Sequence, residues 1–213
     1  MILPLDQSQR RYTVSEYMQI EREATDRHEY RDGKIVGMAG GSANHSKIML
    51  NFLGWLNVQL EGKPCRAYVS DLRLRIPRKV LYTYPDGLVV CGPLQFDPAD
   101  PQGQTITNPK VIVEVLSPTT EGYDRGEKFE RYSGIETLEE YVLVSQETPK
   151  VETFLRSPNA TWVFTLVRGL ESAVTVQSIG VELPLARIYS GVDLPPQETE
   201  SQTNAQKVSV NKT

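Results

Sequence analysis

The clearest pattern along the chain is helical and lies between residues 43 and 60. Apolar side chains recur there every three or four residues, which places them on one face of an α-helix. We expect a long helix that lies across a sheet and ends at Gly62-Lys63-Pro64. The apolar positions of this face are Ile48, Phe52, Trp55, Leu56 and Leu60.

Two further helices are indicated. Thr13-Val14-Ser15-Glu16 fits a capping box, in which the threonine hydroxyl and the glutamate carboxylate each bind a free amide at a helix start. A second short helix is predicted from about Arg125 to Ser133.

Two continuous apolar runs, 87–91 and 111–116, are typical of central strands that are covered on both faces. The segment 92–109 between them is rich in Pro, Asp and Gln, and we expect a surface loop. Ser157-Pro158-Asn159-Ala160 predicts a hairpin, and the last two strands are expected to close the sheet. The other predicted strands are 34–39, 65–69, 72–76, 141–144, 151–155, 162–167, 174–178 and 181–183.

This order of elements predicts an α/β protein, with a mixed β-sheet flanked by helices in a single domain over residues 13–194. Residues 1–12 are expected to be a lead-in, and the polar residues 195–213 a disordered tail. No apolar run approaches the ~20 residues that span a membrane, and the first residues lack a secretory pattern. We therefore expect a cytoplasmic protein that has no contact with membranes.

The formal net charge of −4 argues against a protein that coats nucleic acid. Charge is unevenly spread, however. Five basic residues between 66 and 79 stand against one acid, and Arg73 and Arg75 alternate with apolar positions on a predicted strand. The basic face could contact phosphates, or it could simply be solvated. Its residues are Arg66, Arg73, Arg75, Arg78 and Lys79.

The two cysteines, Cys65 and Cys91, each lie in an apolar, strand-like run. In a reducing cytosol, two buried free thiols are the simpler expectation, with a disulfide as the alternative. Two Cys and two His without a CxxC motif also argue against a structural zinc site.

Glu114 interrupts the apolar run 111–116. An unpaired buried carboxylate is costly, so it needs a partner, an edge position or a function. A salt bridge, a structural hydrogen bond and a solvent-facing edge all remain open. Asp86 lies at the start of the neighbouring run, just after Pro85, so the two carboxylates could converge on a hard cation such as Mg²⁺. A nearby lysine could then hold or deprotonate a water, or neutralise phosphate charge.

The motifs Tyr84-Pro85-Asp86 and Val113-Glu114-Val115-Leu116-Ser117-Pro118, followed by Asp124, Lys128 and Tyr132, resemble the Uma-two family of restriction endonucleases. That family belongs to the PD-(D/E)XK nuclease superfamily. The resemblance extends from about Tyr12 to Leu194. It implies a restriction-endonuclease-like fold, dependence on Mg²⁺ for which Mn²⁺ may substitute, and nucleic acid, most simply DNA, as the substrate.

The chain departs from the superfamily signature at one position, because Leu116 stands where a lysine is expected. Relatives of this type supply the amine from the following helix, and Lys128 is the candidate. It lies one helical turn from Asp124 and one from Tyr132, so the three share a helix face. The alternative is a surface pair between Asp124 and Lys128 with no catalytic role.

The resemblance also assigns supporting roles. Glu29 matches an acid that such nucleases place on the first helix, where it could reach the metal directly or through water; a solvated helix-end acid is the alternative. His45 matches a histidine that could orient a phosphate or a ligand water; helix capping or packing is its alternative. Asp71 is a weaker carboxylate candidate. The segment 40–47 lacks the spacing of a phosphate-binding loop and is expected to be a turn and helix start.

The leading hypothesis is a Mg²⁺-dependent endonuclease acting on DNA, with Asp86, Glu114 and Lys128 as catalytic residues and Asp86, Glu114 and Glu29 near the metal. A second hypothesis is a nuclease-fold module that binds nucleic acid or a protein without turnover. A third is a nuclease acting on RNA or on special ends. Cutting both strands of a duplex favours a homodimer.

Overall fold

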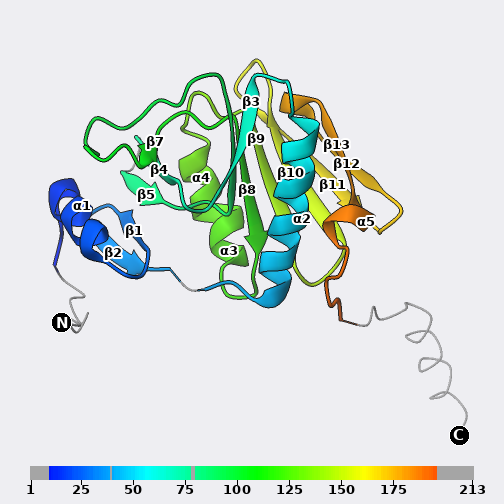
Figure 1. Cartoon of the computed structure of the whole chain (residues 1–213), viewed down its shortest axis with the longest axis horizontal. Helices are drawn as coiled ribbons and strands as arrows, with labels where there is room; N and C mark the ends of the chain where they lie inside the picture. The colour runs from blue at the N-terminus through cyan, green and yellow to red at the C-terminus, as the bar shows by residue number, and fades with distance from the viewer. Residues whose placement is uncertain (1–9, 39, 78–79, 196–213) are drawn as a thin grey trace, which may run out of the picture.

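The computed structural model describes residues 10–38, 40–77 and 80–195. Most of the expected lead-in and tail, together with Arg78 and Lys79, lies outside the described residues. Within the described part, no helix has both the length and the apolar character needed to cross a membrane. The structure is a mixed α/β arrangement of sheets with few helices, as the sequence predicts (Figure 1).

The larger sheet has six strands in the order β11-β10-β9-β8-β6-β3. Only the β8–β9 pair is parallel. The two continuous apolar runs, β6 and β8, are neighbours, as expected from the sequence. The structure adds that they are antiparallel, with Gly87 opposite Val113. The six strands are β3 (Cys65–Val69), β6 (Gly87–Cys91), β8 (Val111–Leu116), β9 (Glu140–Ser145), β10 (Lys150–Arg156) and β11 (Trp162–Arg168).

The second sheet has five short strands in the order β2-β1-β5-β4-β7. Helix α1 (Val14–Glu23), which begins at the predicted capping box, packs on this sheet. Tyr17 of α1 lies against the rings of Tyr30 and Tyr82. The strands are β1 (His28–Arg31), β2 (Lys34–Gly37), β4 (Arg73–Ile76), β5 (Leu81–Thr83) and β7 (Thr105–Ile106).

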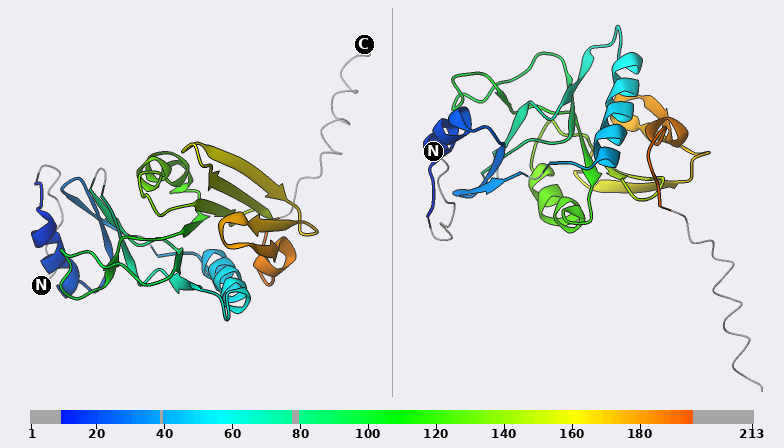
Figure 2. Two further views of the ribbon diagram at one scale, coloured as in Figure 1. Left: turned by 90° about the horizontal axis from the view of Figure 1, so that it is seen from above. Right: turned by 60° about the horizontal axis from the view of Figure 1, so that its bottom comes forward.

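Helices cover both faces of the larger sheet (Figure 2). Because successive side chains of a strand point to opposite faces, Val111, Val113 and Val115 of β8 join the core under α2 (Ala43–Gln59). Ile112 and Leu116 join a separate core with Tyr132 on the other face. The helix on that face is made of α3 (Glu121–Tyr123), the π-helix η1 (Asp124–Lys128) and α4 (Phe129–Tyr132).

The long helix α2 agrees with the periodic pattern. Ser42 caps it through a hydrogen bond from the His45 N–H, and its predicted apolar face is buried apart from the partly buried Trp55. Gly87 of β6 lets this helix come close, because a Cβ at that position would lie 2.9 Å from atoms of both Leu53 and Met49. A larger residue after Asp86 would have to displace the ends of these two side chains.

The last two predicted strands do not close the larger sheet, so that prediction is wrong. β12 (Ala173–Val176) and β13 (Val181–Pro184) pair only with each other. They are joined by the 3-10 turn η2 (Gln177–Ile179) and followed by α5 (Leu185–Ile188). Their apolar side chains pack with those of α2 instead, which satisfies the same alternating pattern.

The segment 92–109 is more than a surface loop. It contributes β7 and carries Asp97 and Asp100 into the interior, where they meet the predicted basic face. Arg73 Nη2 lies 2.9 Å from Asp100 Oδ2, and Arg75 Nη1 lies 3.1 Å from Asp97 Oδ1. Arg73 is therefore neither free for phosphates nor solvated, and both interpretations of this face are wrong there, while Arg75 is paired but 33% exposed.

The prediction that Cys65 and Cys91 are free thiols is also wrong, because a disulfide joins them. The two residues lie directly opposite each other on the antiparallel strands β3 and β6. This register joins two distant strands, so neither apolar run shows it alone. It brings together residues 26 positions apart.

Candidate active site

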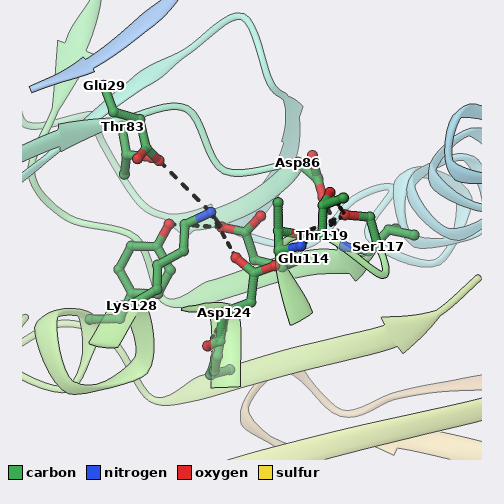
Figure 3. Close-up of polar contacts among 12 residues, drawn as sticks. Glu29, Thr83, Asp86, Glu114, Ser117, Thr119, Asp124 and Lys128 are labelled. Carbon is green, nitrogen blue, oxygen red and sulfur yellow. Dashed lines mark hydrogen bonds and ion pairs between the residues drawn. The ribbon is translucent and has the colours of Figure 1, made fainter. Parts of the chain in front are cut away.

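Four of the residues singled out in the sequence converge at one end of the β6–β8 pair (Figure 3). Asp86 directly precedes β6, and Glu114 lies in β8 beside it. Alternation along β8 turns Glu114 toward the face that carries α3, η1 and α4. Asp124 and Lys128 reach the same place from η1.

Glu114 is fully enclosed. Its Oε1 accepts hydrogen bonds from Lys128 Nζ at 2.7 Å and from the Tyr132 hydroxyl at 2.8 Å. Burial raises the pKa of Glu114 to about 8, although the nearby ammonium of Lys128 opposes this rise. The solvent-facing edge considered for Glu114 is therefore wrong, and its carboxyl group is held by partners in the interior.

Lys128 faces three carboxylates. Its Nζ lies 2.7 Å from Glu114 Oε1, 3.3 Å from Asp124 Oδ1 and 4.0 Å from Glu29 Oε1. Burial by itself would lower the pKa of Lys128, but these carboxylates outweigh it and raise the pKa above its usual value. Lys128 is thus a charged ammonium at neutral pH, and its pair with Asp124 is buried rather than on the surface.

The π-helix η1 begins at Asp124 and ends at Lys128. A π turn is wider than an α turn and is often found at functional sites. Here it lets both side chains of this turn point into the site.

Asp86 is held on one oxygen. Its Oδ2 accepts hydrogen bonds from the Val115 N–H at 2.8 Å and from His45 Nε2 at 3.0 Å. Burial raises the pKa of Asp86, but these hydrogen bonds outweigh it and hold the pKa below its usual value. The hydrogen bond to Asp86 also raises the pKa of His45. His45 therefore orients Asp86, and its backbone N–H takes part in helix capping as well.

Glu29 was expected on the first helix, and this placement is wrong. Helix α1 ends at Glu23, and Glu29 lies on β1, which pairs with β2 and β5. The segment 28–31 is short and charged, so it offers no clear periodicity. The Glu29 carboxylate accepts hydrogen bonds from Arg31 Nε at 2.6 Å and from the Thr83 hydroxyl. It borders the site with its charge already matched by Arg31.

Asp71 lies apart from this site. Its side chain is 74% exposed and forms an ion pair with Arg27 at the surface. The structure thus gathers Glu29, His45, Asp86, Glu114, Asp124, Lys128 and Tyr132, but not Asp71.

Sequence analysis missed Tyr123, Thr83 and Arg31. The Arg31 guanidinium lies 4.0 Å from the centre of the Tyr123 ring, and Lys128 Nζ lies 5.9 Å from the same centre. Tyr123 thereby forms an aromatic wall beside the two cations. Its position next to Asp124 in the sequence was the only available signal.

The donor set was tested for a divalent cation. No group of three or more His, Cys, Asp or Glu side chains in the described residues has the arrangement of a metal site. Asp86 Oδ1 and Glu114 Oε2, however, receive no hydrogen bond from the described residues, which leaves one free carboxylate oxygen on each strand. Two carboxylates completed by water fit Mg²⁺, which keeps several waters in protein sites.

The fold and this acidic site define a class of protein with a restriction-endonuclease-like architecture. A crystal structure described as "a putative nuclease belonging to DUF820", from Anabaena variabilis, superposes with a TM-score of 0.67. The match covers 84% of this chain and 97% of that chain at 18% sequence identity, so it shows the common fold.

A family model named Uma2, described as "Putative restriction endonuclease", matches residues 14–186. Two curated relatives come from Synechocystis, and both are called uncharacterized proteins. The first, slr1290, is 36% identical over 178 residues, which cover 83% of this chain and 90% of the relative. The second, sll1609, is 35% identical over 157 residues, which cover 74% and 88%. The chain belongs to the Uma2 family, which confirms the resemblance identified in the sequence.

Proposed function

We propose that this protein is a Mg²⁺-dependent endonuclease that hydrolyses phosphodiester bonds in DNA. Membership of the Uma2 family supports a nuclease function and nucleic acid as the ligand. The single observation that carries the metal dependence is the charge of the site. Lys128 Nζ contacts the carboxylates of Glu114 and Asp124, and Asp86 lies beside them with His45. The acids outnumber the basic side chains, so a cation could balance the site.

Asp86 and Glu114 would hold the cation through their free oxygens. When bound, Mg²⁺ would polarise the phosphoryl group and lower the pKa of a bound water. Mn²⁺ has similar preferences for carboxylate and water ligands and would substitute.

Tyr132 and His45 would position the two carboxylates that hold the cation. Tyr132 fixes the Glu114 carboxylate, and His45 fixes that of Asp86, so neither side chain has to be ordered when substrate arrives. Both are positioning residues in this proposal.

Lys128 would act through its charge. Because its pKa is raised, it stays protonated and is a poor base for the attacking water. Its ammonium would instead donate a hydrogen bond to a phosphate oxygen, where negative charge builds up in the transition state. From the helix, the amine reaches the face of β8 on which both Glu114 and Leu116 lie.

The first test is cleavage of plasmid DNA with Mg²⁺ or Mn²⁺ by the wild-type protein and by Asp86→Asn. We expect the variant to lose roughly a thousandfold in rate, because several kcal/mol of charge stabilisation depend on the cation. Asp71→Asn is the matched control, since it removes an exposed acid and should cleave normally. Absence of cleavage by folded wild-type protein with either metal would contradict the proposal.

One observation favours a second function. Lys128 is bound tightly to Glu114, and the lysine of the superfamily signature is replaced by Leu116. A module that binds DNA without cleaving it would retain binding in Asp86→Asn while the wild type shows no turnover.

A two-fold dimer, which would present two sites to a duplex, is part of the first proposal and is measured by light scattering.

A further inference from the structure

A groove of about 500 Å³ opens beside Asp86, between helix α2 and strand β3. One of its ends is formed by Asp86 and His45, which hydrogen-bond to each other. Along α2, the residues that line it continue from His45 to Asn57. At 1.5 Å per residue this is a length of roughly 18 Å. The groove therefore leads away from the carboxylates of the candidate active site.

The walls of the groove are mainly apolar. Leu50 of α2 and Val69 of β3 line it and are 67% and 55% exposed, which is unusual for such side chains so close together. Met49 and Leu53 form its floor where α2 meets Gly87. No lysine or arginine is among the lining residues of the described chain, so the groove is poorly suited to a phosphate backbone.

The glycine at position 54 is an argument that this groove binds a ligand. It lies inside helix α2 at an exposed position, where glycine is unfavourable relative to alanine. A Cβ at Gly54 would meet no atom of the described chain within 4 Å, so packing within the protein does not require glycine here. Its absence of a side chain leaves the groove open over the middle of the helix.

Polar backbone atoms lie along the opposite wall. β3 is an edge strand that pairs only with β6. The Gly92 N–H binds the Pro64 carbonyl at 2.9 Å, so the alternation of an antiparallel ladder turns the N–H and C=O of Ala67 toward the free edge. Ala67 lines the groove and offers one donor and one acceptor to a ligand.

We propose that this groove takes an unpaired nucleobase from a nucleic acid strand whose phosphate lies at Asp86. The inference rests on the proposed function and names its substrate class. A base is flat, uncharged and rimmed with donors and acceptors, which matches apolar walls with polar edge atoms. A base paired inside a duplex cannot enter, so the protein prefers single strands, or strands with unpaired bases, over intact duplex.

The charges elsewhere agree with this preference. Binding to duplex DNA is dominated by phosphate contacts from a basic face. The strand that was expected to supply such a face instead pairs Arg73 with Asp100 and Arg75 with Asp97. The chain also carries a net charge of −4.

The test compares Gly54→Trp with Val58→Trp by fluorescence anisotropy, using labelled oligonucleotides in the presence of Ca²⁺, a hard cation that binds oxygen ligands. Gly54→Trp adds a bulky ring at the groove, and its Cβ would meet no atom of the described chain within 4 Å. Val58→Trp adds the same bulk one turn further along α2, at an exposed residue outside the lining. The probes are a single DNA strand, the same strand with abasic sites, its duplex, and the RNA of the same sequence.

We expect the wild type to bind the single strand more tightly than the duplex, and the abasic strand roughly tenfold more weakly than the intact one. Gly54→Trp should bind the single strand as weakly as the abasic strand, while Val58→Trp should behave as wild type. If RNA binds more tightly than DNA, the groove still binds a base, and the preferred nucleic acid is RNA.

Three outcomes overturn the inference: tighter binding of the duplex, equal binding of intact and abasic strands, or equal effects of the two tryptophan variants. If the groove binds a protein instead of a base, the intact and abasic strands should bind equally. Because the measurement needs no turnover, a protein that cleaves nothing can still meet or fail it. Failure of the proposed function and failure of this inference are therefore distinguishable.

Discussion

Among the described residues, two clusters of charged side chains lie in the interior or at its border, and they differ in how their charges balance. In the five-stranded sheet, Arg73 and Arg75 pair with Asp100 and Asp97. At the candidate active site, Lys128 faces Glu114 and Asp124, with Asp86 beside them. The first cluster has as many cations as anions, while the second has acids in excess.

The difference teaches which buried charges hold the fold together and which point to a ligand. In the balanced cluster, further hydrogen bonds from Tyr82 and Thr105 satisfy the carboxylates, so no additional ion is needed. In the unbalanced cluster the surplus charge is costly, and burial together with the neighbouring acids raises the pKa of Glu114 to about 8, which favours a proton on its carboxyl group. A bound cation would replace that proton.

The largest effect on stability is expected in the balanced cluster. Asp100→Asn leaves the guanidinium of Arg73 buried without its carboxylate, since the two side chains are 3% and 5% exposed. Breaking a buried pair on one side costs about 3–5 kcal/mol. We expect a loss of this size in the free energy of unfolding, measured with urea, and unchanged cleavage per folded molecule. A loss below about 1 kcal/mol would show that Arg73 does not depend on this partner.

The second prediction concerns pH in the metal-free protein. The pKa of Glu114 is about 8 in the folded state against 4.5 in the unfolded chain, so the folded state binds more protons between these values. Stability is therefore fully present below about pH 4.5 and falls as pH rises toward 8, by up to about 1.4 kcal/mol per pH unit.

Urea unfolding across this pH range, with a chelator present, measures the slope. Glu114→Gln should remove it, because glutamine does not titrate, and Asp71→Asn should keep it. Added Mg²⁺ should also flatten the wild-type slope. If the wild type is equally stable at both ends of the range without metal, the pKa of Glu114 is not raised in the folded state and the prediction is wrong.

The smallest effect is expected for Asp124→Asn. This change removes one acid from the unbalanced cluster, and Lys128 keeps its contact with Glu114. We expect the free energy of unfolding to change by no more than about 1 kcal/mol, in either direction, because lost attraction and relieved repulsion offset each other. A loss as large as that of Asp100→Asn would remove the contrast between the two clusters.

The sequence predicted those parts of the fold that have strong local periodicity. Helix α2 has an apolar face over four turns, β6 is an apolar run, and β8 is one apart from Glu114, so each was recognisable without its neighbours. Glu114 was recognisable for the same reason, since a carboxylate is conspicuous in such a run. Lys128 came from helical spacing together with the family resemblance.

What could not be predicted depends on register between distant segments. Cys65 and Cys91 face each other only because β3 and β6 pair at that register. The acids that neutralise Arg73 and Arg75 come from a segment with no periodicity, and β1 is too short to distinguish Glu29 on a strand from Glu29 on a helix. Local patterns carry no information on these pairings.

The wide turn from Asp124 to Lys128 has a consequence for how such a site can change over time. A π turn accommodates one extra residue inside a helix while the segments on either side keep their places. In this chain the amine of Lys128 comes from such a turn, and the strand holds Leu116 in the core. A positive charge beside Glu114 can therefore be provided by a helix and need not come from the strand that carries the acid.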